Sequence, residues 1–169
     1  PWAAVEMRDS LPENAREDAC VVIGMEGAMD IYKWKYGVAP GKGKREPLTE
    51  ELGYYFQGYS FVIGANNACY KKKLFLENKA TKQVLYIHTQ DQYRPDIRKN
   101  LKDQLNVDLT GYAGKVRLSD IPQGVYRFGM LAEDQCSRLK LFNYSSWVLA
   151  VDDTAQSVTD TLKNTTVNR

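Results

Sequence analysis

Short apolar segments alternate with polar turns along most of this chain, and few of the apolar segments are long enough for a helix. Two clear strand patterns, Gly111 to Leu118 and Val125 to Ala132, are joined by a turn signal at Pro122 to Gly124. A third strand, Gln83 to Thr89, precedes them and leads into a charged turn at Asp91 to Asp96. The remaining segments are expected to pair with this central unit.

The same alternation predicts further strands on both sides of the unit. The segment Cys20 to Glu26 is nearly continuous and β-branched, which is typical of a strand buried on both faces. In Met29 to Tyr36, the side chains of Tyr32, Trp34 and Tyr36 fall on one face and form an aromatic ladder. An aromatic strand is expected at Gly53 to Gly64, and Gly58 within it marks a bulge or a close approach of another backbone. The other expected strands are an edge strand at Trp2 to Met7 and strands at Cys69 to Glu77, Arg138 to Phe142 and Trp147 to Val151.

About nine short strands and one short helical piece at Pro95 to Gln104 predict an all-β fold, an antiparallel β-sandwich of immunoglobulin-like or jelly-roll-like type. We expect a lead-in segment over 1–19, the sandwich over 20–151, and a polar tail or last strand over 152–169. The proline and glycine residues of 37–52 predict a surface loop. Its Gly-Lys pairs lack the spacing of a phosphate-binding loop.

Composition fits one globular domain: 169 residues, 43% hydrophobic and 26% charged. The net charge of +2 is too small to indicate nucleic-acid binding. No apolar run reaches the length of a membrane span, and no signal peptide is present. Because the sequence begins with Pro1, we expect a processed chain or a fragment of a larger protein.

The three cysteines, Cys20, Cys69 and Cys136, are far apart in the sequence and form no metal-binding pair. With His88 as the one histidine, we expect neither a metal nor a cofactor. At most one disulfide can form. The favoured interpretation is three small buried residues, and the alternative is a single bridge in an oxidising compartment.

Two interpretations remain open for the charged turn. In the structural one, Arg94 clamps a corner by reaching a carbonyl or carboxylate, and Asp96 caps the following turn. In the functional one, Asp91, Tyr93, Arg94 and Asp96 line a polar ligand site. The run Lys71-Lys72-Lys73 is expected to be a solvated strand edge rather than an anion site. His88 is expected to be a partly buried strand residue.

Other candidate chemistry depends on residue type alone. Tyr32, Trp34 and Tyr36 are expected to pair across strands, and their alternative role is a platform on which a sugar ring stacks. Glycoside hydrolysis needs two carboxylates held across a cleft. The candidates by type are Glu26, Asp30, Asp91 and Asp96, and nothing in the sequence pairs any two of them. No catalytic residue is therefore assigned.

The central block runs R-P-D-I, then a polar stretch, then G-Y at the start of a strand, then I-P-Q-G-V-Y-R. This order resembles a β-sandwich accessory module of large bacterial cell-envelope proteins that often also carry surface-polysaccharide machinery. In that module an R-x-D-V segment follows a strand, G-F opens the next, and L-x-x-G-x-Y begins a third. The residues at those positions here are Arg94, Asp96, Gly111, Tyr112, Gly124 and Tyr126.

The resemblance covers 58–151, with Ile97 in place of the valine and Tyr112 in place of the phenylalanine, and does not extend to the segment before it. It implies an extracytoplasmic, envelope-associated sandwich without catalytic residues. We therefore expect a non-catalytic accessory module of a bacterial surface protein that binds carbohydrate or cell-wall polymer. The alternative is a structural or protein-interaction module that docks a neighbouring domain.

Overall fold

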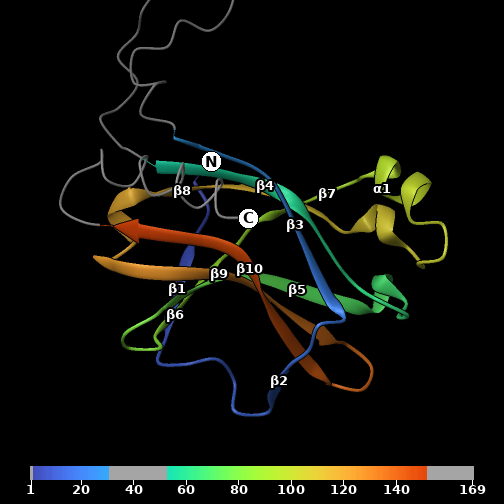
Figure 1. Cartoon of the computed structure of the whole chain (residues 1–169), viewed down its shortest axis with the longest axis horizontal. Coiled ribbons are helices and arrows are strands. Elements are labelled where there is room, and N and C mark those ends of the chain that lie inside the picture. Colours follow the sequence, from blue (N-terminus) through green and yellow to red (C-terminus); the bar gives the residue numbers. More distant parts are fainter. Residues whose placement is uncertain (1, 31–52, 152–169) are drawn as a thin grey trace, which may run out of the picture.

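The computed structural model describes residues 2–30 and 53–151, which form two β-sheets stacked as layers (Figure 1). The larger sheet has six strands in the order β1-β6-β5-β9-β10-β2, and the smaller has four in the order β3-β4-β8-β7. Neighbouring strands of this described part are antiparallel except for β2 beside β10. The predicted all-β sandwich is confirmed.

The strands of the larger sheet are, in spatial order, β1 (Val5–Arg8), β6 (Val84–Ile87), β5 (Tyr70–Asn78), β9 (Gly124–Asp134), β10 (Lys140–Val151) and β2 (Ala15–Glu17). Those of the smaller sheet are β3 (Val21–Asp30), β4 (Gly53–Val62), β8 (Gly111–Arg117) and β7 (Gln90–Gln92). The helical segments are α1 (Pro95–Asn100) and the single turns η2 (Asn67–Cys69), η3 (Val107–Leu109) and η4 (Leu118–Asp120). No helix within 2–30 and 53–151 is long and apolar enough to cross a membrane.

The main core lies between the sheets, because each strand turns alternate side chains inward. Leu74 and Leu76 of β5 are fully buried there. The rings of Phe56 on β4 and Phe128 on β9 meet edge to face with centroids 5.0 Å apart, so they join the two layers directly. A second apolar cluster around Phe75 occupies the outer face of the larger sheet.

Two strands of the larger sheet come from the predicted lead-in segment. The strand β1 pairs with β6 at one edge, as expected for the segment Trp2 to Met7, and β2 pairs with β10 at the other edge. The sandwich thus includes residues before Cys20. The predicted aromatic ladder of Tyr32, Trp34 and Tyr36, the loop over 37–52 and the tail over 152–169 lie outside the described residues.

The prediction that Cys20 to Glu26 is buried on both faces is wrong. Among the strands that the structure describes, β3 lies at the edge of the smaller sheet, next to β4. Val21 and Met25 are buried, whereas Ile23 between them is half-buried and Glu26 is exposed. A β-branched run favours a strand through side-chain shape and says little about which faces are covered.

A bulge in β3 accounts for the glycine at position 58. Met25 pairs with Gly58 and Gly27 pairs with Gln57, so Glu26 has no partner in the β3–β4 ladder. A Cβ atom at Gly58 would lie 1.9 Å from the carbonyl oxygen of Gly24. The predicted bulge and close backbone approach therefore occur together, with the bulge on the facing strand.

The two strands predicted at Arg138 to Phe142 and Trp147 to Val151 are not separate, because β10 runs through both segments as one strand. Its pairing with β9 changes register between Tyr144 and Val148. The side chain of Asn143 donates to the carbonyl of Val21 at 2.9 Å and accepts the Tyr144 backbone N–H. Turn-forming residues thus produce an irregularity within a strand rather than its end.

Candidate functional site

A cleft opens in the larger sheet because β6 is much shorter than β5. Within β5, only Leu74 to Glu77 pair with β6. After β6 the chain leaves this sheet through His88 and Thr89 and joins β7 in the other sheet. Among the described strands, the first residues of β5, Tyr70 to Lys73, therefore have a partner on one side only, which is β9. A cleft of about 770 Å³ lies between this free edge and β7.

The ionisable side chains that line this cleft are mainly basic. Lys71, Lys72 and Lys73 come from β5, while His88 and Asp91 come from the segment that crosses between the sheets. Further lining side chains are Tyr70, Thr89, Gln92, Tyr93 and Gln135. The expected solvated edge is correct for Lys71, which is exposed, and wrong for Lys72.

Lys72 places an ammonium group beneath the cleft. It has the same inward orientation as Leu74 and Leu76, and its Nζ donates to the carbonyl oxygen of Ser60 on β4 at 2.8 Å. Burial lowers the pKa of Lys72 to about 8, and the charge of Asp91 opposes this shift. Since an ammonium carries three donors, the bond to Ser60 leaves two for other acceptors.

Arg94 forms a clamp at the end of the smaller sheet. Its guanidinium donates to both carboxylate oxygens of Glu26, one of them at 2.8 Å, and to Asp96 at 2.9 and 2.7 Å. These bonds raise the pKa of Arg94 and lower that of Asp96. The clamp connects the β3 bulge, which exposes Glu26, to the first turn of α1.

This geometry corresponds to the corner-clamp interpretation of Arg94, with one correction. Arg94 itself occupies the N-cap position of α1, no side chain caps that helix, and Asp96 lies one residue inside it. Of the four residues predicted to share a ligand site, only Asp91 and Tyr93 line the cleft. Arg94 and Asp96 are engaged with each other and with Glu26.

His88 is not the partly buried strand residue that the sequence predicts. The strand β6 ends at Ile87, and half of the His88 side chain is exposed at the cleft. Its Nε2 lies 3.2 Å from the Oε2 atom of Glu6 on β1. From this position a ring N–H of His88 can donate one further hydrogen bond in the cleft.

Two smaller clefts adjoin the first. One of about 530 Å³ shares Tyr93 with it and contains Arg98, Lys99 and Lys102. The other, of about 290 Å³, shares Lys71, Lys73 and Tyr86 with it and adds Arg8 and Lys140. We name the basic side chains of the three clefts the basic track: Arg8, Lys71, Lys72, Lys73, His88, Arg98, Lys99, Lys102 and Lys140.

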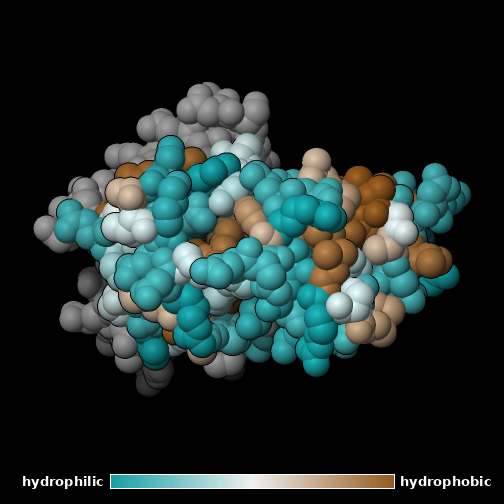
Figure 2. Space-filling model, turned by 90° about the horizontal axis from the view of Figure 1, so that it is seen from below, coloured by the Kyte–Doolittle hydropathy of each residue, from teal (hydrophilic) through white to brown (hydrophobic). Residues whose placement is uncertain are grey.

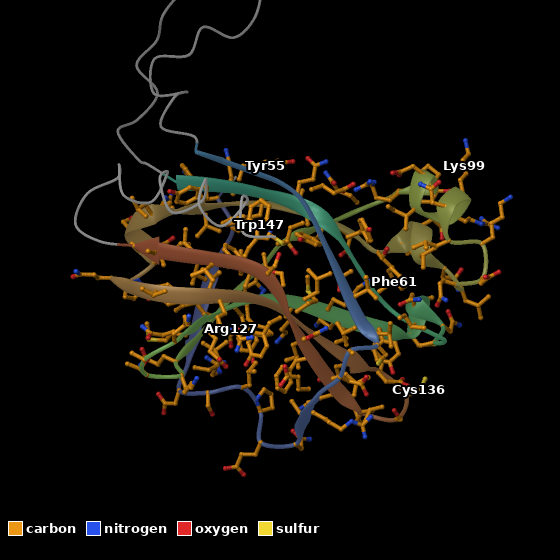
Figure 3. All side chains as sticks on the ribbon, viewed as in Figure 1. Tyr55, Phe61, Lys99, Arg127, Cys136 and Trp147 are labelled. Carbon is orange, nitrogen blue, oxygen red and sulfur yellow. The ribbon has the colours of Figure 1, made fainter. Side chains whose placement is uncertain are left out.

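The basic track extends along the molecule to the end that carries α1, where Lys99 points outward (Figure 3). Three carboxylates line the same clefts: Glu6, Asp91 and Glu133. Two of them have cationic partners, since Glu6 contacts Arg8 and His88, and Glu133 contacts Arg138. Sequence reasoning missed the track because its members come from segments far apart in the chain, and only the three adjacent lysines form a visible run.

Within the described part of the chain, no two of the carboxylates named as hydrolase candidates line the same cleft, and the two acids that do share one, Glu6 and Glu133, each contact a cationic side chain. Asp91 is the one carboxylate that lines the largest cleft. Glu26 and Asp96, two of the other candidates by type, are both held by Arg94. The arrangement is suited to holding negative charge rather than to acid–base cleavage of a glycosidic bond.

Several residues that carry the resemblance to the envelope module have structural roles. The hydroxyl of Tyr126 donates to the carbonyl of Pro122 at 2.6 Å, and that of Tyr112 contacts the sulfur of Met25 at 2.9 Å. A side chain at Gly111 would collide with the carbonyl of Gln92. These residues shape the sandwich and do not form the clefts. Compared with known proteins, the chain matches no family model, no curated protein and no solved structure.

Proposed function

We propose that this chain is a non-catalytic accessory module of a bacterial surface protein, located outside the cytoplasm, that binds a linear acidic carbohydrate or cell-wall polymer. The observation that carries the proposal is the basic track, in which nine basic side chains and three carboxylates line adjoining clefts. A small anion would need one cleft. A polymer with a charge on each repeat would use the whole series.

Electrostatics favour such a ligand over a neutral one. Lys71, Lys99 and Lys102 are exposed, and no ion pair of theirs occurs among the described residues. Exposed single contacts contribute only a few tenths to about 1 kcal/mol each, so affinity must come from several contacts made together. Lys72 differs, because its partly desolvated ammonium gains more from a bound anion than an exposed one does.

Tyr93 supplies a contact of another kind. Its side chain is 66% exposed and lies where the two larger clefts meet. A solvent-exposed aromatic ring beside polar groups offers a face on which the apolar side of a sugar ring can stack. This position supports carbohydrate as the backbone of the polymer, while the lysines support its negative charge.

The docking of a neighbouring domain is the second candidate. Ile63, Leu105 and Leu109 are exposed hydrophobic residues of the segments that adjoin α1 and η3. Hydrophilic residues cover most of the face seen in Figure 2, and hydrophobic ones gather toward the α1 end. An exposed apolar group of this kind is suited to contact with another protein surface.

The binding test uses polymers of defined charge on the whole chain. Polygalacturonate and poly(glycerol phosphate) are the acidic probes, and dextran is the neutral one, with binding measured by calorimetry. In Lys71→Gln/Lys73→Gln, affinity for the acidic probes should fall about tenfold. The matched control, Lys79→Gln/Lys82→Gln, removes the same charge at the opposite end of β5 and should leave affinity unchanged.

The outcomes separate the two candidates. Binding of the acidic probes that weakens with salt and with Tyr93→Ala supports the acidic carbohydrate. Equal loss in both lysine pairs would mean nonspecific attraction to a cationic protein and would contradict the assigned cleft. Failure of all three polymers to bind would remove the polymer proposal and leave the docking of a neighbouring domain as the better account.

A further inference from the structure

Two cysteines from distant parts of the chain meet at one corner of the larger sheet. Cys69 immediately precedes β5, and Cys136 lies in the turn between β9 and β10 (Figure 3). Tyr70 pairs with Asp134 in the β5–β9 ladder. One step beyond that pair, the backbone N–H of Gln135 donates to the carbonyl oxygen of Cys69 at 2.9 Å. Cys136 is therefore the next residue after the direct backbone partner of Cys69.

The turn that carries Cys136 is held in place by its own hydrogen bonds. The Cys136 backbone N–H donates to Oδ1 of Asp134 at 2.9 Å, and the Arg138 N–H donates to the Asp134 carbonyl at 2.9 Å. Burial raises the pKa of the Cys69 thiol, and the neighbouring Cys136 thiol adds to this rise through its charge and a hydrogen bond. The two thiols are thus close enough to interact.

Accessibility distinguishes the three cysteines. The interpretation of all three as small buried residues is wrong, because Cys136 is exposed and Cys20 and Cys69 are only partly covered. Cys20 is engaged elsewhere: its backbone N–H donates to Asp18 at 2.9 Å, and burial together with Asp18 raises the pKa of its thiol to about 11. This raised pKa keeps the Cys20 thiol protonated at neutral pH, so little of it is in the thiolate form that takes part in exchange.

We propose that Cys69 and Cys136 form a disulfide when the protein meets an external disulfide, and that Cys20 remains a thiol. The exposed Cys136 thiolate attacks one sulfur of the external disulfide and releases one thiolate. The Cys69 thiolate then attacks the Cys136 sulfur of the mixed disulfide and releases the second thiolate. The pair loses two protons and two electrons, and the external disulfide is reduced to two thiols.

The bond would fix the β9–β10 turn to the beginning of β5. The neighbours Ala68, Tyr70 and Gln135 all line the largest cleft, so the bond would lie beside the lysines of the basic track. It also links positions that are far apart in the sequence, which restricts the unfolded chain strongly. The oxidised protein should therefore have a higher Tm than the reduced protein.

The test maps the bond by mass spectrometry. The native protein is incubated with glutathione disulfide, free thiols are alkylated in denaturant, and the protein is cleaved with trypsin without reduction. Cleavage after lysine and arginine places the three cysteines on separate peptides, 17–33, 46–71 and 128–138. We expect 46–71 linked to 128–138 and lighter by two hydrogen atoms than the sum of the two, with 17–33 alkylated.

Matched variants connect the bond to stability. In Cys69→Ser and in Cys136→Ser, oxidation should no longer raise Tm, whereas Cys20→Ser should keep the full rise. Alkylation of all three cysteines after oxidation would overturn the proposal. A link that includes 17–33, or a Cys136–Cys136 bond between two molecules, would overturn it as well. None of these readouts depends on polymer binding.

Discussion

The buried ammonium of Lys72 predicts a pH dependence of stability that a single substitution removes. Its pKa falls from 10.5 in the unfolded chain to about 8 in the folded protein, chiefly through burial. Between these two values the unfolded state binds more protons than the folded state. Stability therefore rises with pH across this range and is lost as pH falls through about 8.

The magnitude follows from the two pKa values. One pKa unit corresponds to about 1.4 kcal/mol, so the complete effect is about 3 kcal/mol. Most of it develops between about pH 7 and about pH 9.5, where the linkage relation gives a rise of about 2 kcal/mol. Partial exposure of the residue makes this an upper bound.

Lys72→Met keeps an unbranched side chain that is one atom shorter and removes the titrating group. Urea unfolding of both proteins at the two pH values gives the difference between their unfolding free energies. Other groups titrate in the same range, including Cys20, whose raised pKa lowers stability above about pH 9. They are present in both proteins and cancel in the comparison. We expect the wild type to gain about 2 kcal/mol relative to Lys72→Met on going from the lower to the higher pH.

A pH-independent difference between the two proteins would refute this reasoning. It would mean that the Lys72 ammonium is solvated in the folded state, so that folding does not shift its pKa. A separate, constant difference between them is expected, because the variant leaves the Ser60 carbonyl without the Lys72 donor, at a cost of about 1–3 kcal/mol.

Three further substitutions test single contacts that stabilise the fold, with the free energy of unfolding measured in urea. Gly58→Ala should lower the free energy of unfolding by more than about 2 kcal/mol, because the alanine Cβ would overlap the Gly24 carbonyl. An unchanged free energy of unfolding would disprove the close approach of the two backbones. Arg94→Met should lower the free energy of unfolding by about 2 kcal/mol, because the charged hydrogen bonds of Arg94 are lost. A loss of polymer binding at unchanged stability would instead assign Arg94 to a ligand site. Tyr144→Phe should lower the free energy of unfolding by about 1–3 kcal/mol, because the Tyr144 hydroxyl donates to the buried Glu77 carboxylate at 2.9 Å. Stability equal to that of the wild type would show that water replaces this hydrogen bond.

Local patterns predicted the strands well and their neighbours poorly. Alternation located β8 and β9 within a few residues, because side-chain direction in a strand depends only on position along the chain. Whether a strand lies at an edge depends on pairing between distant segments. The continuous apolar run of β3 likewise indicated burial on both faces, although Ile23 is half-buried and Glu26 is exposed.

The sequence predicted the residues of the charged turn that line the candidate site but not the other residues that line it. Asp91 and Tyr93 stood out because a strand ends beside them, and both line the largest cleft. The role of Lys72 required knowing that β6 stops short and leaves the edge of β5 open. The contact between Cys69 and Cys136 likewise depends on the β5–β9 register, which no local pattern encodes.

The shortness of β6 has a consequence for how the sequence of this protein can evolve. The cleft exists because the backbone changes sheets at His88 and Thr89, whereas the packing that holds the layers together lies at Phe56 and Phe128. Most side chains on the cleft wall can therefore be exchanged without disturbing the core. A chain with the same backbone path could therefore carry different side chains on this wall and keep the same core.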